Sequence, residues 1–319
     1  MKKVLINKPI HTDAITRLSE EVEVLTPFTA SPDEIVEMLS DVHGMILCAG
    51  MKMQAPEMDR ARSLEVIGRH GAGLDIVDVK EATKRSLPVV FTPFGPTEST
   101  AEHAFLLMMA TARKITLLDR ETRNGNFHIR DHVVGRELMG AKVGVVGFGH
   151  IGQRFAEMCR GALGMEVYAF DPFVSRSVVE SWGAVYSDNI VKMAEAVDIL
   201  SMHVPSTPQT HHLVNEEVLK ALGSQGILVN AARGPVVDEA ALVRALQEGW
   251  IYGAGLDVYD PEPPTDDNPL FKLDNTVLTP HLASFTEEGR QRMGLMVAED
   301  VLRVLRGEKP IYPANPEVL

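Results

Sequence analysis

A glycine loop at residues 147–152 constrains the fold of this chain more than any other feature. Gly147, Gly149 and Gly152 follow an apolar run at 143–146 and precede a segment of helical character at 153–159. Glycines in that setting permit a tight turn and let the backbone approach a pyrophosphate, whose charge the helix N-terminus favours. The loop therefore predicts a dinucleotide-binding fold, although an ordinary glycine-rich turn between strand and helix would have the same spacing.

An acidic residue follows the next predicted strand. Asp171 comes after residues 167–170 and lies 19 positions beyond Gly152, where the acid that binds the adenosine ribose belongs. Its carboxylate would accept hydrogen bonds from the ribose hydroxyls and repel a 2′-phosphate, so the sequence favours NAD and disfavours NADP. The alternative is that Asp171 caps a helix ahead of Pro172, and both roles could coexist.

Short apolar runs alternate with helical stretches along most of the chain. Such alternation predicts an α/β protein with mostly parallel sheets. A helix is expected at 33–39, opened by Ser31 as its cap and Pro32 in its first turn. The expected strands lie at residues 4–6, 22–25, 45–48, 66–68, 89–92, 143–146, 167–170, 199–203, 227–230, 255–258 and 277–279.

A cluster of proline and glycine at 92–96 separates two series of strands. After it, residues 97–118 are expected to form one long helix rich in Ala, Leu and Met. The last helix, at about 287–305, has an apolar face that could pack back on the first lobe. We therefore expect two domains, which are residues 1–99 with 285–319, and residues 100–284.

Composition excludes several classes of protein. The net charge is −13 and Lys and Arg do not cluster, so no nucleic-acid partner is expected. No apolar run approaches the roughly 20 residues that span a bilayer, and Pro9 helps to end the short one near the N-terminus. Cys48 and Cys159 lack metal-ligand spacing. We expect a cytoplasmic protein with free thiols, no metal site and no membrane contact.

Polar residues follow three predicted strands of the second half. Arg233 lies shortly after 227–230, Glu262 follows 255–258, and His281 follows 277–279. The carboxyl ends of parallel strands meet at one edge, so these side chains can converge on one crevice. Arginine binds carboxylates in a bidentate manner, and histidine exchanges protons near neutral pH. Taken singly, Arg233 could instead form a salt bridge, Glu262 could be solvated, and His281 could be a buried structural histidine.

These motifs, in this order, resemble the D-2-hydroxyacid dehydrogenase family over essentially the whole chain. The resemblance implies a flavodoxin-like substrate lobe and a Rossmann-type dinucleotide-binding lobe, both with parallel sheets. It implies hydride transfer between NAD (NADH) and C2 of a small 2-oxo or 2-hydroxy acid. It also implies a homodimer, as does the length of helix 97–118 and the arm that follows it to Arg136. The matching stretches are 147–152 with Asp171, 203–210, 229–238, 255–263 and 279–281.

The resemblance assigns a role to each polar residue. Arg233 would bind the substrate carboxylate and polarise the carbonyl, and His281 would be the acid/base. Glu262 would pair with the imidazole, favour its protonated form and orient the ring. The amides of Ala72 and Gly73, in the turn at 71–75, would help to hold the substrate, although that turn could simply precede a helix.

The cofactor contacts follow from the same resemblance. His203 would contribute through its backbone, Asp257 would bind the nicotinamide carboxamide, and Thr100 would border the nicotinamide. His103 is otherwise expected to be structural. The expected cofactor-binding residues are Thr100, Gly147, Gly149, His150, Ile151, Gly152, Asp171, His203, Val204, Pro205, Ala231, Ala232, Arg233, Asp257, His281, Ala283 and Ser284.

Two departures from the family pattern concern the substrate. Ala283 stands where most relatives have glycine, and would crowd the nicotinamide side of the cleft. Cys48-Ala49 replaces the Arg-Ser pair that phosphoglycerate dehydrogenases usually carry. Residues 50–53 could therefore line a pocket for a less charged acid, whereas Arg69 and His70 keep an anionic side-chain site open.

One alternative function belongs to a different class. Some proteins with the same set of Arg, Glu and His residues are NAD-sensing corepressors, which carry tails and peptide-binding surfaces outside the dehydrogenase core. The sequence ends at Leu319 with no such tail. The enzyme interpretation is therefore favoured, and the sequence does not single out one 2-hydroxy acid.

Overall fold

Parallel strands organise both halves of the chain. The computed structural model describes residues 1–319 and divides them into two compact units. Unit 1 comprises Met1–Thr97 and Ser284–Leu319, and unit 2 comprises Glu98–Ala283. Every strand pairing within the two sheets is parallel. The predicted α/β class with two parallel sheets is confirmed.

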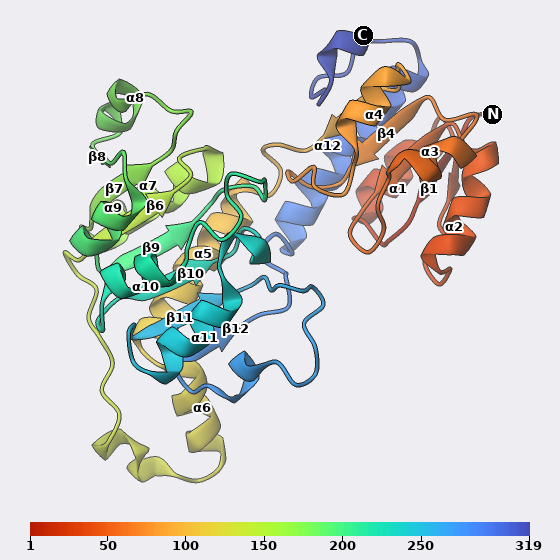
Figure 1. Cartoon of the computed structure of the whole chain (residues 1–319). Helices are drawn as coiled ribbons and strands as arrows, with labels where there is room; N and C mark the ends of the chain where they lie inside the picture. Colours follow the sequence, from red (N-terminus) through yellow and green to blue (C-terminus); the bar gives the residue numbers. More distant parts are fainter. The chain divides into compact units, whose positions relative to one another are not determined.

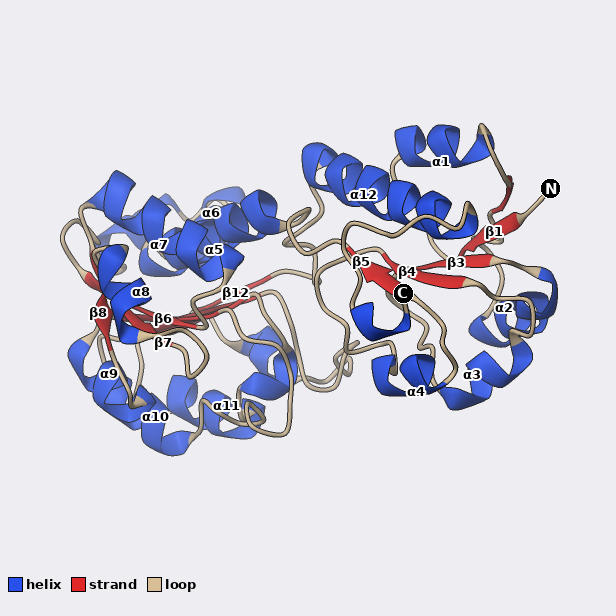
Figure 2. Ribbon diagram, turned by 90° about the horizontal axis from the view of Figure 1, so that it is seen from above, coloured by secondary structure: helices blue, strands red, loops and turns tan.

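Unit 1 is built on a five-stranded sheet in the order β2-β1-β3-β4-β5. This is the flavodoxin-like order that the sequence predicted. Helices α1 and α12 cover one face of this sheet, and α2, α3 and α4 cover the other (Figure 2). The strands are β1 (Lys3–Ile6), β2 (Glu23–Leu25), β3 (Gly44–Leu47), β4 (Val66–Arg69) and β5 (Val89–Phe91); the helices are α1 (Thr12–Ser19), α2 (Pro32–Met38), α3 (Ala55–Arg60), α4 (Val79–Lys84) and α12 (Glu287–Leu305).

Local sequence signals explain where the helices of unit 1 begin. The Ser31 hydroxyl accepts from the amide of Glu34, and the Glu34 carboxylate accepts from the amide of Ser31, which closes a capping box ahead of α2. Helix α12 packs on the sheet of unit 1, as the sequence predicted. Its residues Val297 and Val301 lie in one apolar core with strand residues Val4, Ile46 and Val66, and Figure 1 shows blue α12 beside the orange strand β4.

Unit 2 is built on a seven-stranded sheet in the order β12-β11-β10-β9-β6-β7-β8. This is the doubly wound order of a Rossmann fold with a seventh strand added, and the direction of winding changes between β6 and β9. Helices α5 and α7 lie on one face, and α9, α10 and α11 lie on the other (Figure 2). The strands are β6 (Lys142–Val146), β7 (Glu166–Phe170), β8 (Val185–Tyr186), β9 (Ile199–Met202), β10 (Ile227–Asn230), β11 (Gly253–Leu256) and β12 (Thr276–Leu278); the helices are α5 (Thr97–Ala112), α6 (Ile115–Arg123), α7 (His150–Leu163), α8 (Arg176–Ser181), α9 (Ile190–Ala196), α10 (Glu216–Leu222) and α11 (Glu239–Gln247).

The predicted single helix over 97–118 is wrong. Helix α5 ends at Ala112 and α6 begins at Ile115, because Lys114 adopts the left-handed backbone region with φ 52°. Its ammonium lies 5.1 Å from the centre of the Tyr252 ring, a distance suited to a cation–π contact. The chain therefore turns away from the sheet at Lys114, and no side chain of α6 is buried.

None of the helices combines the length and the apolar character that crossing a bilayer would require. The longest, α12, has 19 residues but carries charged side chains along its length. Five short 3₁₀ helices complete the secondary structure at Leu39–Asp41, Phe127–Asp131, Gly234–Val236, Pro269–Lys272 and Pro316–Val318.

Candidate active site

The glycine loop occupies the point at which the winding of the unit 2 sheet changes direction. It follows β6, and α7 begins at His150 directly after it. Gly147 has φ +92°, and a Cβ at that position would lie 2.6 Å from the carbonyl oxygen of His203, which follows β9. The loop is therefore packed against the backbone of His203, at the carboxyl edge where open α/β sheets bind ligands. The strand, turn and helix required by the prediction are all present.

Asp171 fastens the end of β7 to this loop. Its carboxylate accepts from the amide of Phe148 at 2.8 Å and from the amide of Phe173 at 2.8 Å. The alternative that Asp171 caps a helix is wrong, because α8 begins at Arg176 and its N-cap is Ser175. A negative charge is therefore held beside the glycine loop, and its contact with a ribose stays a prediction.

The turn that carries Arg233 is shaped by a buried asparagine that the sequence prediction missed. The Asn230 side chain accepts from the amide of Ala232 at 3.0 Å and donates to the carbonyl of Arg233 at 2.9 Å. A Cβ at Gly234 would lie 1.7 Å from the carbonyl oxygen of Tyr259. This close approach places the Arg233 turn against the segment that leaves β11. The available signal in the sequence was an asparagine that ends an apolar strand. In the structure Asn230 is 1% exposed.

The structure joins His281 to Glu262. The Nδ1 atom of His281 forms a hydrogen bond with Oε1 of Glu262, as predicted from the family pattern. Because Nδ1 is engaged by the carboxylate, Nε2 is the ring atom left to exchange a proton. The two side chains are 42% and 38% exposed, so the pair is open to a small molecule. His281 also has an unusual backbone, with φ 52°.

Asp257 fixes the segment around His281 from inside the protein. Its side chain is fully buried, and it accepts from the hydroxyl of Thr279 at 2.6 Å and from the amides of Leu282 and Ala283 at 3.0 and 2.8 Å. Burial raises the pKa of this carboxyl, but hydrogen bonds from His103, Thr279 and the two amides lower it by more. The pKa of Asp257 therefore lies below its ordinary value, and the group is a carboxylate at neutral pH.

His203 and the other predicted residues have different surroundings. Burial lowers the pKa of the His203 ring to about 3, so this ring is neutral and suited to a structural role. Thr100, on α5, and Ala231, Ala232 and Ala283 are all buried in unit 2. Ile151 opens α7 beside His150, and Val204 and Pro205 follow His203. The contacts of all these residues with a cofactor stay predictions.

The predicted substrate turn and Ser284 lie in unit 1. The amide of Gly71 donates to the hydroxyl of Thr92 at 2.9 Å, whereas the amides of Ala72 and Gly73 donate to no protein group. Those two amides are available to a ligand, and their contact with a substrate stays a prediction. Residues 50–53 differ from expectation, because the side chains of Met51 and Met53 are buried in the apolar core of unit 1.

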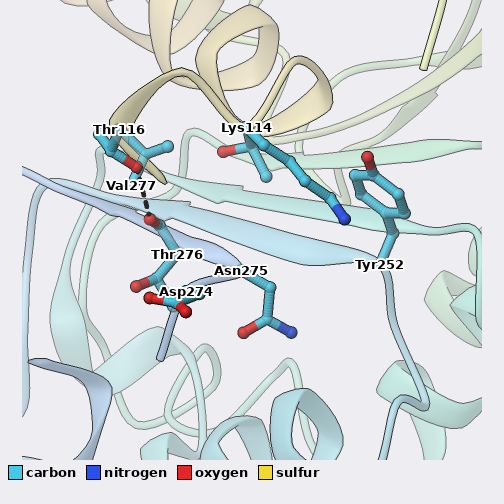
Figure 3. Close-up of a pocket in the computed structure, with 8 residues that line it drawn as sticks. Lys114, Thr116, Tyr252, Asp274, Asn275, Thr276 and Val277 are labelled. Carbon is cyan, nitrogen blue, oxygen red and sulfur yellow. Dashed lines mark hydrogen bonds between the residues drawn. The ribbon is translucent and has the colours of Figure 1, made fainter. Parts of the chain in front are cut away.

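A pocket at the other end of the strands is separate from these residues. It is lined by the start of β12, by residues just before β11 and β12, and by the junction of α5 and α6, including Tyr252, Asn275 and Lys114 (Figure 3). The hydroxyl of Thr116 donates to the carbonyl of Thr276 across it at 3.2 Å. Asp257 and His281 follow the carboxyl ends of the same strands. The candidate active site is therefore the open edge that carries them, and not this pocket.

Comparison with known proteins identifies the family of this chain. Residues 105–283 match the model described as D-isomer specific 2-hydroxyacid dehydrogenase, NAD binding domain. The chain belongs to this family. It is similar to a glyoxylate reductase of Korarchaeum cryptofilum, with 38% identity over 323 residues that cover 99% of this chain and 97% of the relative. The predicted resemblance is thereby confirmed, and unit 2 contains the family's domain for a nicotinamide dinucleotide.

Two further similarities concern substrate and cofactor. The chain is 40% identical over 310 residues to a D-3-phosphoglycerate dehydrogenase of Methanocaldococcus jannaschii, covering 97% of this chain and 58% of that enzyme. It likewise spans 58% of the length of the enzyme of that name from Archaeoglobus fulgidus. Among solved structures, it is similar to an NADPH-dependent glyoxylate/hydroxypyruvate reductase from Sinorhizobium meliloti in complex with NADP and malonate. That match has 34% identity and a TM-score of 0.87, and covers 99% of this chain and 97% of that chain.

Gly149→Ala tests whether the glycine loop binds a dinucleotide. A Cβ at residue 149 meets no protein atom within 4 Å, so the methyl group should not disturb folding. It would stand where the backbone must approach a pyrophosphate, and the Kd for NADH should rise by roughly tenfold or more. Gly161→Ala is the matched control, because residue 161 is on α7 and also meets nothing within 4 Å. Fluorescence titration with NADH should separate the two variants while their melting temperatures stay close; equal Kd values would contradict the assignment.

Proposed function

We propose that this protein is an NAD-dependent D-2-hydroxyacid dehydrogenase that interconverts small 2-oxo and 2-hydroxy acids. The observation that carries the proposal is the His281–Glu262 pair at the carboxyl edge of the unit 2 sheet. The Arg233 turn packs beside the segment that leads to Glu262. A proton-exchanging group and a cation suited to a carboxylate are therefore supplied by neighbouring segments.

The loop residues fit a nicotinamide dinucleotide. Position 149 is open where a pyrophosphate would approach, the N-terminus of α7 lies directly after it, and the Asp171 carboxylate is held beside the loop. These residues would hold the diphosphate and the ribose. A nicotinamide held by these residues would supply hydride chemistry at C2 of the acid.

The protein side chains supply the remaining steps. Arg233 binds the substrate carboxylate and polarises the 2-oxo group, which favours attack at C2. The Nε2–H of the His281 imidazolium donates a proton to the oxygen as negative charge develops there. The Glu262 carboxylate stabilises the imidazolium through Nδ1 and holds the ring in place. In the oxidative direction, the neutral Nε2 of His281 accepts the hydroxyl proton, and Glu262 stabilises the imidazolium that forms.

His281→Gln tests the reaction and separates it from the corepressor function. General acid–base catalysis contributes about 10²–10⁴-fold, so kcat for 2-oxo acid reduction should fall by about that factor. The screen uses glyoxylate, hydroxypyruvate, its phosphorylated analogue, pyruvate and bulkier 2-oxo acids, and NADH oxidation is followed by its absorbance at about 340 nm. NADH should still bind to the variant. A wild-type protein that binds NADH but reduces none of these acids would support a cofactor-sensing protein instead.

The cation beside the predicted substrate turn of unit 1 is already engaged by the protein. Burial raises the pKa of the Cys48 thiol to about 11, so this residue is neutral at the position where phosphoglycerate dehydrogenases usually carry arginine. Arg69 already donates to the carbonyls of Gly73 and Leu47 at 2.9 and 3.3 Å, and thereby fastens the glycine turn to β3. We therefore propose an unphosphorylated acid such as glyoxylate or hydroxypyruvate, with a phosphorylated acid as the competing class that the same screen measures.

Asp171 supports NAD as the cofactor, although a related reductase is NADPH-dependent. Asp171→Asn should lower the preference for NADH over NADPH, expressed as the ratio of kcat/KM values, by about tenfold or more, because it removes the charge that repels a 2′-phosphate. The amide oxygen of asparagine can still accept from Phe148 or Phe173. Asp171→Ala, which removes both the charge and these acceptors, shows how much of the effect comes from the loop. An unchanged ratio in both variants would refute the ribose role.

We also propose a homodimer formed through α6 and the segment after it. No residue of α6 or of the following 3₁₀ helix is buried. Ile115, Phe127 and Val134 are 51%, 64% and 80% exposed. Exposed apolar side chains that gather in one segment are typical of an interaction surface.

Light scattering tests this assembly directly. The wild-type protein should have twice the chain mass of 35.0 kDa, whereas Phe127→Glu combined with Val134→Glu should give 35.0 kDa. The control is Val178→Glu, which places the same charge at an exposed apolar residue of α8. A monomeric wild-type protein would overturn the proposal.

Both cysteines support a reducing compartment. Cys48 and Cys159 are free and buried. Burial raises the pKa of the Cys159 thiol well above its ordinary value, which keeps it protonated and unreactive. We propose that the protein works in the cytoplasm, where thiols stay reduced.

A further inference from the structure

We propose that His103, on α5, is a positioning residue for His281, and that it acts through the hydroxyl of Thr279 and the carboxylate of Asp257. The sequence indicated only a structural role for His103. The inference rests on the proposed function of His281 as the acid/base. It adds a residue that touches neither the Glu262 side chain nor the proton-exchanging atom of His281.

A continuous chain of polar contacts links the four residues within unit 2. The Nε2 atom of His103 lies 2.9 Å from the hydroxyl oxygen of Thr279 and 3.5 Å from Oδ1 of Asp257, and the Thr279 oxygen lies 2.6 Å from the same Oδ1. The Asp257 carboxylate then accepts from the two amides that follow His281. The side chain of His103 is 12% exposed and that of Asp257 is fully buried, so water competes little for these contacts.

The direction of each hydrogen bond follows from the number of protons available. The Asp257 carboxyl is ionised, because its pKa is lowered, and can only accept. Thr279 has one hydroxyl hydrogen, and the 2.6 Å contact gives it to Asp257. The hydroxyl oxygen must then accept from His103, which requires the hydrogen of the imidazole on Nε2. His103 therefore acts as a donor in either its neutral Nε2–H form or its protonated form.

This donor selects one of two orientations for the Thr279 hydroxyl. The carbonyl oxygen of Leu256 lies 3.4 Å from the same hydroxyl and is a second acceptor. A hydrogen bond from His103 orients the hydroxyl toward Asp257 and keeps a strong donor on the buried carboxylate. Without His103, the hydroxyl can turn to Leu256, and Asp257 would lose a donor that its burial makes important.

The carboxylate matters because His281 has a backbone conformation that a side chain disfavours. Its φ is 52°, in the left-handed region. The amide of His281 donates to the carbonyl of Asp257 at 2.8 Å, and the next two amides donate to the carboxylate of the same residue. Such a conformation persists only where surrounding contacts over-determine it. If the carboxylate shifts, His281 can relax and its ring can leave Glu262.

A pair of variants at residue 103 separates positioning from mere packing. His103→Gln keeps an N–H donor at about the reach of Nε2, whereas His103→Phe keeps a ring of similar volume without any donor. With the best 2-oxo acid of the screen, His103→Phe should lower kcat by roughly tenfold to hundredfold, while the KM for NADH changes less than about twofold. The deuterium isotope effect measured with NADH that carries deuterium at both C4 positions should rise, because hydride transfer becomes slower than product release. His103→Gln should recover most of kcat.

Thr111→Val is the matched control on the same helix. Thr111 is 3% exposed, and its hydroxyl has no hydrogen-bond partner. This variant should leave kcat and the isotope effect near the wild-type values. Equal losses in His103→Gln and His103→Phe, or an unchanged kcat in His103→Phe, would overturn the positioning role.

A crystal structure of His103→Phe keeps this test independent of the proposed function. We expect residue 281 to leave the left-handed region or its ring to separate from Glu262. An unchanged backbone at 281–283 together with an intact His281–Glu262 hydrogen bond would refute the inference even if the enzyme were active. A wild-type protein that reduces no 2-oxo acid would instead refute the proposed function, and this structure would still decide the role of His103.

Discussion

The buried carboxylate of Asp257 is the interaction on which the rest of the candidate site depends. An isolated charge inside a protein is strongly unfavourable unless hydrogen bonds compensate for the lost hydration. Here the compensation comes from Thr279 and from the amides of Leu282 and Ala283. These donors reach the carboxylate only when residues 279–283 follow one path. The contacts that satisfy the buried charge therefore also hold the backbone on both sides of His281, whose ring is hydrogen-bonded to Glu262.

The parallel sheet of unit 2 brings the other parts of the site to the same edge. The glycine loop after β6 packs on the backbone of His203 after β9, and the Arg233 turn after β10 packs on the segment after β11. Each of these close approaches is possible because one residue lacks a Cβ. Polar side chains then fasten the loops, with Asp171 at the glycine loop and Asn230 at the Arg233 turn. The site is thus assembled from strand ends that are far apart in sequence.

Sequence patterns predicted the features that depend on local signals. The strands fall within two residues of their predicted bounds, and α12 has the predicted bounds, because apolar periodicity and capping residues are visible in the sequence. The capping box at Ser31 belongs to the same class of signal. The pairing of His281 with Glu262 came from the order of motifs in the family, and spacing alone would have left each residue with a structural alternative.

The errors arose where tertiary contacts decide the outcome. The break at Lys114 has no glycine or proline to announce it, and it is accompanied by a contact with Tyr252, far away in sequence. The two-residue strand β8 is too short to show a periodicity. Met51 and Met53, on either side of Lys52, are buried in the core of unit 1. The sequence had suggested that these residues line a substrate pocket. The network of His103 could not be inferred, because it joins α5 to a strand end 176 residues away.

A single labelling experiment tests most directly the proposal that a hydride is transferred, at this edge of unit 2, from NADH to C2 of a 2-oxo acid with D stereochemistry. Reduction of hydroxypyruvate with NADH that carries deuterium at both C4 positions should give D-glycerate that carries one deuterium at C2, as chiral chromatography with mass spectrometry would show. Glycerate of the L configuration, or a product without deuterium at C2, would contradict it.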